Sequence, residues 1–292
     1  MSRLRNLGHE LFDFVLNGAL RSGWARTVSY RLGLHGRLRL REHTLRVRSV
    51  RDTPPLRVGF ASDFHAGPVT HPAHIDTAAE LLTAAQPDIL LLGGDFVSLN
   101  VGYVDDVARR LGAIPAALGR FAVLGNHDYR RRRAAIVARA LELQGIEVLQ
   151  NDNVRLPAPH ADVWICGLDD YELGTPDGEA ALAHAEGTRL VLMHGPDGLL
   201  ALGDRPFAAA FAGHTHGGQI ALPWGTPIVV PGGKLDRRYS HGQFHLHPEP
   251  NRGHLLVSRG VGCSAFPIRA FADPEVHLIR VESIFHGDAG TD

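Results

Sequence analysis

Between residues 56 and 216 the sequence repeats one pattern: a short, apolar, β-rich run that ends in a cluster of polar residues. The runs are "LRVGFASDFH" (56–65), "DILLLGGDFV" (88–97), "FAVLGNHDY" (121–129), "VWICGLDDY" (163–171), "LVLMHGPD" (190–197) and "AAAFAGHTH" (208–216). Helices are expected between several of them, at 74–85, 104–112, 132–144 and 178–186. Strands that alternate with helices predict an α/β fold with buried sheets, whose functional sites lie at the carboxyl ends of strands.

The C-terminal part follows a different pattern. The runs "HLLVSRGVG" (254–262) and "EVHLIRVES" (275–283) are typical of strands but have no helix between them, which indicates an antiparallel or mixed sheet edge. Residues 217–253 are rich in Gly, Pro and basic residues and are expected to form a long loop. Loops longer than about 12–15 residues in a compact domain are usually functional or disordered.

The N-terminal part differs from the rest in charge. Residues 1–57 hold 12 Arg and 4 acidic residues, a net charge of +8, whereas the remainder holds 18 basic and 27 acidic residues, a net charge of −9. Residues 4–20 have the apolar spacing of an amphipathic helix, and 43–50 alternate like a strand. Such a basic helix favours peripheral contact with an anionic membrane, but a helix packed on its own domain has the same pattern. We therefore divide the chain into this helix and lead-in strand (1–55) and one domain (56–292).

Composition sets the broad class of the protein. With 292 residues, 44% of them hydrophobic, the chain can bury a sizeable core. Its two cysteines, Cys166 and Cys263, form no disulfide framework, and Glu10 and Asp13 interrupt the apolar run of an N-terminal signal peptide. No stretch reaches the roughly 20 apolar residues of a spanning helix. These features predict a cytoplasmic protein, either free or peripheral at the inner membrane face.

The polar clusters at five strand ends contain the residue types that bind metal ions. Their candidate residues are Asp63, His65, Asp95, Asn126, His127, Asp128, His194, His214 and His216. A single histidine or "GGD" at a strand end is often simple turn chemistry. Carboxylates and imidazoles delivered together by five strand ends, beside glycines that permit close approach, favour a shared functional site instead.

The ordered set "SDFH" (62–65), "GGDF" (93–96), "GNHD" (125–128), "MHGPD" (193–197) and "GHTHGGQ" (213–219) resembles the motifs of the calcineurin-like metallophosphoesterase superfamily. The resemblance covers residues 56 to 283. It implies a four-layer αββα sandwich of two mixed β-sheets, which agrees with the strand and helix pattern described above.

The resemblance also implies a dinuclear metal centre. The first ion would be bound by Asp63, His65 and His216, the second by Asn126, His194 and His214, and both by Asp95. One carboxylate shared by two cations suits the separation of about 3.5–4 Å used in two-metal phosphoryl chemistry. Imidazole and carboxylate ligands suit Mn, Fe, Zn or Co, so the identity of the two divalent ions stays open.

The same resemblance assigns the chemistry. A hydroxide that bridges the ions would attack phosphorus, and His127 would protonate the leaving oxygen or stabilise the transition state. Asp128 would assist as a catalytic residue that supports the site, although it is equally typical of a turn residue.

Two further segments bear on the substrate. The trailing "GGQ" and "SRGVGCSAFPIRAFADPEV" (258–276) resemble the bacterial membrane-associated phosphodiesterases and UDP-2,3-diacylglucosamine pyrophosphohydrolases. This favours cleavage of a phosphodiester or pyrophosphate bond in a lipid- or nucleotide-linked substrate such as UDP-2,3-diacylglucosamine. Candidate substrate contacts are Lys234, Arg237, Arg238 and Arg269, since Arg can bind phosphate oxygens bidentately. A solvated basic loop explains the first three equally well.

Other functions remain in competition at this point. A phosphomonoesterase, a cyclic-nucleotide or nucleic-acid phosphodiesterase, and a non-catalytic membrane-binding scaffold all use related folds. The scaffold is disfavoured because every motif position is filled. Nucleic acid is disfavoured because no interleaving of aromatic and basic residues, typical of a single-strand groove, is visible.

Overall fold

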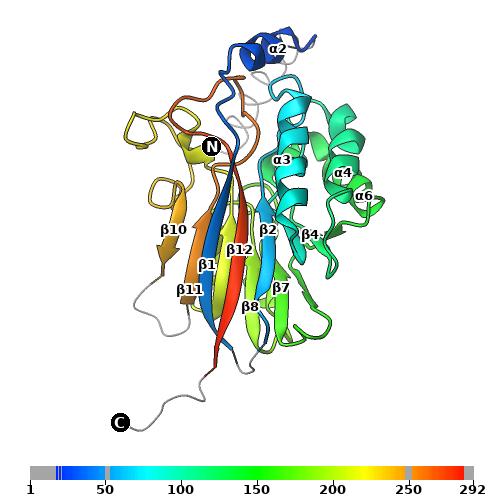
Figure 1. The fold of residues 1–292 in the computed structure, drawn as a ribbon, viewed down its shortest axis with the longest axis vertical. Coiled ribbons are helices and arrows are strands. Elements are labelled where there is room, and N and C mark those ends of the chain that lie inside the picture. Colours follow the sequence, from blue (N-terminus) through cyan, green and yellow to red (C-terminus); the bar gives the residue numbers. More distant parts are fainter. Residues whose placement is uncertain (1–17, 19, 21, 50–52, 247–251, 286–292) are drawn as a thin grey trace.

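Two six-stranded β-sheets stand face to face in the computed structural model, which describes residues 18, 20, 22–49, 53–246 and 252–285 (Figure 1). In spatial order the first sheet contains β1 (Arg39–Ser49), β12 (Glu275–Phe285), β2 (Leu56–Ala61), β3 (Ile89–Leu92), β4 (Arg120–Ala122) and β5 (Glu147–Val148). The second contains β10 (Gly242–His245), β11 (Arg252–Val257), β9 (Phe207–Ala212), β8 (Thr188–Leu192), β7 (Val163–Gly167) and β6 (Asp152–Arg155). Both sheets are mixed: β12 is antiparallel to β2, and β6 and β10 are antiparallel to their neighbours.

Helices cover the outer face of each sheet. The α-helices are α2 (Trp24–Arg31), α3 (Pro72–Ala85), α4 (Val104–Gly112), α5 (Asn126–Tyr129), α6 (Ala134–Glu142), α7 (Gly178–Ala181) and α8 (Gly198–Leu202). Short 3-10 helices are η1 (Val101–Tyr103), η2 (Arg130–Arg132) and η3 (His216–Gly218). Residues of α3, α4 and α6 pack on the first sheet, and residues of α7 and α8 pack on the second. The four-layer αββα sandwich expected from the sequence is therefore confirmed.

The apolar runs of the sequence fit this layering because the central strands are buried on both faces. In β3, Ile89 and Leu91 point to the core between the sheets, whereas Leu90 and Leu92 point to the helices. A strand covered on both sides needs an uninterrupted apolar run rather than alternation. Helix α4 instead buries only one stripe, from Val104 to Leu111 at helical spacing.

Four features differ from the sequence prediction. Helix α7 is shorter than the expected 178–186, because Asn153 Nδ2 donates to the carbonyls of Ala181 and Ala183 at its end. Helix α2 was not expected, since "WARTVSYR" lacks a clear apolar period. The expected loop 217–253 contains β10, which pairs with β11. Finally, β1 joins the first sheet in parallel register with β12, although it precedes the boundary expected after residue 55.

The amphipathic helix expected at residues 4–20 lies outside the described part of the chain, apart from residues 18 and 20. None of the helices in the described ranges has both the length and the apolar character needed to cross a bilayer.

Candidate metal centre

The parallel strands of both sheets deliver the predicted ligands to one end of the sandwich. Asp63 and His65 follow β2, Asp95 follows β3, and the "NHD" motif forms α5 after β4. In the second sheet His194 follows β8, and His214 and His216 follow β9. The seven side chains predicted to bind metal thus come from five strand ends of two sheets.

Five of these side chains sit on strained backbone. The residues with a positive φ are Asp63 (55°), His65 (45°), Asp95 (55°), His214 (71°) and His216 (53°). A non-glycine residue in this left-handed region costs about 1–3 kcal/mol and persists only where the surroundings fix it. Main-chain hydrogen bonds do so here: Asp63 N donates to Gly94 O at 2.9 Å and His65 N to Asp95 O at 2.9 Å.

Glycines permit the close approach of these loops, as expected. A Cβ on Gly125 would collide with Asp95 Oδ1, and one on Gly213 would collide with Asp63 Oδ2. Any side chain at these two positions would therefore displace a carboxylate of the site.

Asp95 is the carboxylate that the two halves of the site share. Its Oδ2 lies 3.4 Å from His65 Nε2 and 3.4 Å from His194 Nε2, while its Oδ1 accepts a hydrogen bond of 2.8 Å from His127 N. We call Asp63, His65 and His216 the Asp63 group, and Asn126, His194 and His214 the His194 group. Asp95 stands between them, as a bridging ligand must.

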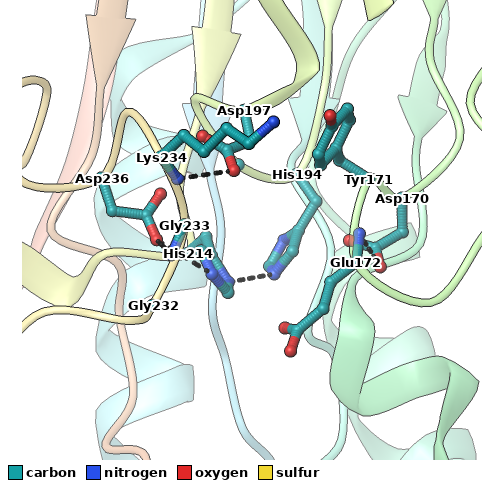
Figure 2. A pocket seen from close by; sticks show the side chains of 11 residues that line it. Asp170, Tyr171, Glu172, His194, Asp197, His214, Gly232, Gly233, Lys234 and Asp236 are labelled. Carbon is teal, nitrogen blue, oxygen red and sulfur yellow. Dashed lines mark hydrogen bonds and ion pairs between the residues drawn. The ribbon is translucent and has the colours of Figure 1, made fainter. Parts of the chain in front are cut away.

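In the His194 group, three ligand atoms converge. His194 Nε2 lies 3.2 Å from Asn126 Oδ1. It also lies 3.2 Å from His214 Nδ1, a contact that Figure 2 shows. The outer nitrogens face oxygens: His194 Nδ1 is within hydrogen-bond distance of the Gly93 carbonyl, at 2.8 Å, and the Asp236 carboxylate lies near His214 Nε2, with Oδ2 3.7 Å away. A proton on each outer nitrogen leaves the inner nitrogen with the lone pair that a metal requires.

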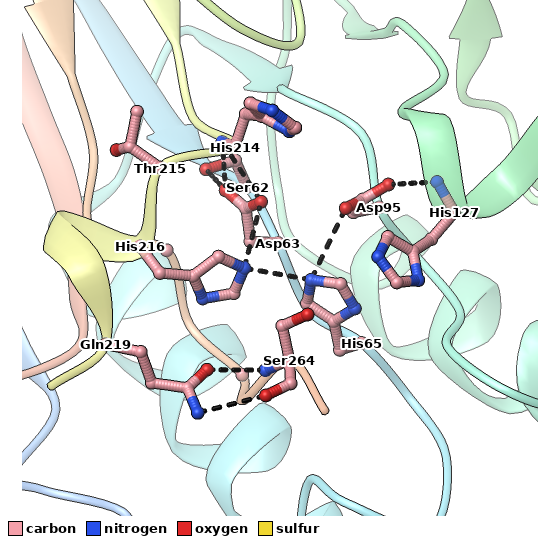
Figure 3. Close-up of polar contacts among 12 residues, drawn as sticks. Ser62, Asp63, His65, Asp95, His127, His214, Thr215, His216, Gln219 and Ser264 are labelled. Carbon is pink, nitrogen blue, oxygen red and sulfur yellow. Dashed lines mark hydrogen bonds and ion pairs between the residues drawn. The ribbon is translucent and has the colours of Figure 1, made fainter. Parts of the chain in front are cut away.

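In the Asp63 group, His216 Nε2 lies 2.9 Å from His65 Nε2 and 3.4 Å from Asp63 Oδ1 (Figure 3). Asp63 accepts hydrogen bonds from Ser62 Oγ at 2.6 Å and from His214 N. Behind the ring, Arg269 Nη2 donates to His216 Nδ1 at 3.0 Å. The outer nitrogen of His216 therefore faces a cation, unlike those of the His194 group.

Burial and charge set the protonation of the site. Burial lowers the pKa of His65 to about 4 and that of His214 to about 3, so both rings are neutral at pH 7. Burial alone would raise the pKa of Asp95, but His194 and His127 hold it well below its usual range. Burial would likewise lower the pKa of His194, but Asp95 raises it well above the usual range. A cation bound here would displace the His194 proton, because a ligand imidazole must be neutral.

The donor set fits two divalent ions. Ligand atoms within 4.8 Å of one another form the sets Asp63–His65–His216, His65–Asp95–His127 and Asp95–His194–His214. The imidazole nitrogens of facing rings approach one another at 2.9–3.2 Å inside a buried pocket, which is the spacing of atoms that converge on shared cations. Nitrogen and carboxylate ligands of this kind suit first-row transition metals.

The two residues predicted to be catalytic lie in different surroundings. The His127 ring lines the groove beside the centre and meets the His65 ring edge-on, with centroids 4.7 Å apart. Asp128 is fully buried and accepts hydrogen bonds from the N–H groups of Phe96, Val97 and Gly125. Asp128 thus ties the Asp95 loop to α5. Asp128 lines neither of the two cavities beside the centre, and its catalytic role stays a prediction.

Two cavities open beside the centre. The larger is a groove of about 650 Å³, lined by Asp95, Asn126 and His127 and by the apolar Ile228 and Phe266. The smaller, about 220 Å³, is lined by Asp170, Lys234 and Asp236 as well as His194 and His214 (Figure 2). A phosphoester bound at the metal ligands can therefore extend along an apolar wall.

The four predicted substrate contacts have different positions. Lys234 lines the smaller cavity, and its N–H donates to Asp197 Oδ2. Arg237 and Arg238 are exposed and line neither cavity, and Arg238 lies over the Tyr239 ring at 5.1 Å.

Arg269, the fourth predicted substrate contact, is buried. Its side chain is 5% exposed, and its guanidinium donates to the carbonyls of Gly262, Arg259 and Ala272 and to His216. These bonds occupy the guanidinium and place it behind the His216 ring, and Arg269 lines neither cavity, so its contact with a substrate stays a prediction.

Two residues of the site escaped the sequence prediction. Asp236, which is 1% exposed, stands beside His214, and Glu172 Oε2 accepts a 2.7 Å hydrogen bond from Asn126 Nδ2. The hydrogen bond that Asn126 Nδ2 donates to Glu172 orients the Asn126 amide so that its Oδ1 faces His194. The only local signal was the Gly-rich segment that contains Asp236.

Comparison with known proteins identifies the family. A sequence model described as calcineurin-like phosphoesterase matches residues 56–218, more than half of the chain. The chain belongs to the calcineurin-like phosphoesterase family. It is therefore a metal-dependent phosphoesterase, and its buried His and Asp sets agree with the dinuclear centre of that family.

Relatives of this phosphoesterase extend over most of the chain. Phosphodiesterase YaeI of Escherichia coli is 32% identical over 238 residues, covering 78% of this chain and 82% of its own. The uncharacterised metallophosphoesterase YkuE of Bacillus subtilis is 28% identical, covering 94% of this chain and 95% of its own. UDP-2,3-diacylglucosamine pyrophosphatase LpxG of Chlamydia trachomatis is 29% identical, covering 77% and 83%.

Proposed function

We propose that the protein hydrolyses a phosphodiester or pyrophosphate bond at two divalent ions held by the Asp63 group, the His194 group and Asp95. The observation that carries this proposal is the position of Asp95 Oδ2, 3.4 Å from an imidazole nitrogen of each group. One carboxylate between two sets of imidazoles suits two-metal phosphoryl transfer.

Each part of the site has a chemical task in this proposal. Bound divalent ions would lower the pKa of water and neutralise charge on phosphate oxygens. His127, at the wall of the groove, would face the leaving oxygen. Burial lowers the pKa of His127 well below its usual range, so the neutral ring offers an N–H hydrogen bond. Asp95 Oδ1 fixes the His127 backbone at 2.8 Å and so couples its position to the centre.

The groove supports an amphiphilic substrate, lipid- or nucleotide-linked, of which UDP-2,3-diacylglucosamine is one example. Ile220, Ile228, Val229 and Phe266 form an apolar wall beside the polar metal ligands. An acyl chain would suit the apolar wall, and a phosphate would suit the metal ligands. Relatives named a phosphodiesterase and a UDP-2,3-diacylglucosamine pyrophosphatase support this choice of bond and substrate class.

A substrate panel tests the proposal. Protein loaded with Mn would be assayed on bis(p-nitrophenyl) phosphate, p-nitrophenyl phosphate and UDP-2,3-diacylglucosamine. We expect the diester and the pyrophosphate to be cleaved faster than the monoester. Faster cleavage of the monoester would instead establish the alternative, a phosphomonoesterase.

A further inference from the structure

Large apolar side chains that remain exposed gather in three segments: 24–34, 220–229 and 266–271. Eleven of the seventeen exposed large hydrophobic side chains in the described residues lie in these short segments. They include some of the most exposed, such as Trp224 at 74%, Leu32 at 68% and Phe271 at 63%. Single exposed apolar residues are normal, but such a concentration marks an interaction surface.

Main-chain hydrogen bonds join the three segments. Arg269 N donates to Leu34 O at 2.7 Å, and Ala221 N donates to Ala270 O at 2.8 Å. In Figure 1, α2 and the orange 266–271 segment lie at the upper end of the molecule, towards which β2 runs. We call the three segments together the apolar rim. Ile220, Ile228 and Phe266 belong both to the rim and to the groove, so the rim borders the candidate metal centre.

The charge of the rim differs from that of the chain. The three segments contain no Asp or Glu, although residues 58–292 hold 27 acidic residues. Exposed basic side chains flank them: Arg31 and Arg37 near Leu32, and Lys234, Arg237 and Arg238 after residue 229. An apolar surface bordered by cations complements an anionic lipid surface, in which apolar side chains enter the acyl boundary and Arg meets phosphate.

The backbone of Phe271 supports an outward-facing role. This residue has a φ of 53°, which is unfavourable for a bulky side chain, and yet its ring is exposed to solvent. Hydrophobic packing inside the protein therefore does not explain the conformation. Strain of this kind gathers at functional positions, so an exposed ring on such a backbone agrees with a role at the surface.

We propose that the apolar rim docks on the surface of an anionic lipid bilayer and brings the groove to the level of the headgroups. This proposal concerns the surface on which the protein binds, and it does not depend on which phosphoester the protein cleaves. It assigns membrane contact to α2 and two loops beside the centre rather than to residues 4–20 alone.

Vesicle flotation of the full chain tests this docking. The rim variant carries Leu32→Ser, Trp224→Ser and Phe271→Asn, the last because Asn tolerates a positive φ. The matched control carries Ile136→Ser, Leu143→Ser and Leu200→Ser, which are 52%, 63% and 41% exposed and lie outside the rim. Partitioning onto phosphatidylglycerol vesicles should fall at least about tenfold for the rim variant and less than about twofold for the control.

Hydrolysis of bis(p-nitrophenyl) phosphate serves as the folding control and should be unchanged in both variants, since none of the six positions lines the groove. A second measurement uses the wild-type chain: brominated phosphatidylglycerol should quench Trp24 and Trp224 but not Trp164, which packs against the second-sheet core. Wild-type binding to phosphatidylcholine should be weaker and should not depend on salt.

Three results would overturn the docking. The first is equal loss of vesicle binding in the rim variant and the control. The second is a chain without residues 1–17 that no longer binds while the rim variant binds like the wild type. The third is a wild-type dimer that does not float and that the rim variant converts to a monomer, which would make the rim a contact between two copies of this chain.

Discussion

The Asp63 group and the His194 group offer similar ligand atoms but have different neighbours. Behind the His194 group stand a carbonyl, Gly93 O, and a carboxylate, Asp236. Behind His216 stands the guanidinium of Arg269. An acceptor behind an imidazole raises its basicity toward a metal, and a cation has the opposite effect. The two halves of the centre should therefore bind their ions with unequal strength, although the motifs alone make them look equivalent.

The largest expected effect comes from replacing Asp95, the carboxylate that both halves of the centre share. Asp95→Asn should abolish most activity and lower the content of both ions, because the amide cannot bridge two cations. The loss should exceed the ~100-fold that accompanies loss of a partner behind a metal ligand. Elemental analysis and diester hydrolysis measure both effects. Asp105→Asn, an exposed position on α4, is the matched control, and undiminished activity in Asp95→Asn would refute the assignment.

A change at Asp236 should affect one half alone. Asp236→Asn removes the carboxylate beside His214 Nε2 and should weaken metal binding by the His194 group about 10- to 100-fold. Competition titration with a chelator would report one weakened site and one unchanged site. Equal weakening of both sites would contradict the separation of the halves.

Stepwise removal of metal tests directly which of the two groups binds its ion more weakly. We expect the wild-type protein to release one ion before the other, from the Asp63 group first, with affinities that differ by about tenfold. The same experiment on Asp236→Asn should reduce or reverse the difference. Simultaneous release of both ions from the wild type would show that Gly93 O, Asp236 and Arg269 do not make the two metal affinities unequal.

The smallest effect is expected at Glu172. Glu172→Gln retains a hydrogen-bond acceptor for Asn126 Nδ2 but removes its charge, so activity should fall by less than about tenfold. Glu172→Ala should cost more, because the Asn126 amide is then free to turn. Measured kcat and metal content of the two variants would separate orientation from charge, and equal activities would show that Glu172 does not orient Asn126.

The sequence predicts the strand ends well because they depend on local pattern. The run Ile89–Leu92 is apolar on every residue, as a strand buried on both faces requires, and Asp95 follows it after two glycines. Gly125 and Gly213, whose backbones approach Asp95 and Asp63 closely, are likewise visible in the motifs "GNHD" and "GHTHGGQ".

Asp236 and Glu172, which stand beside His214 and Asn126, were not predictable because these partners are distant in sequence. Asp236 is 22 residues from His214, and Glu172 is 46 residues from Asn126. Arg269 illustrates the same difficulty: its residue type suggests a phosphate contact, whereas in the structure its guanidinium donates to main-chain carbonyls and to the His216 ring. Charge alone does not tell whether a side chain points to a substrate or stabilises a loop from within.

The place of β12 between β1 and β2 has a consequence for biosynthesis. β12 is translated more than 200 residues after β2, yet it is the strand that connects β2 to β1. The segment just before it holds the Asp63 loop, since Val261 N donates to Ser62 O and Gly262 N to Asp63 O. Contacts so far apart in sequence form late. On the ribosome, the nascent chain can therefore assemble the Asp63 group only after residues 260–285 have left the exit tunnel.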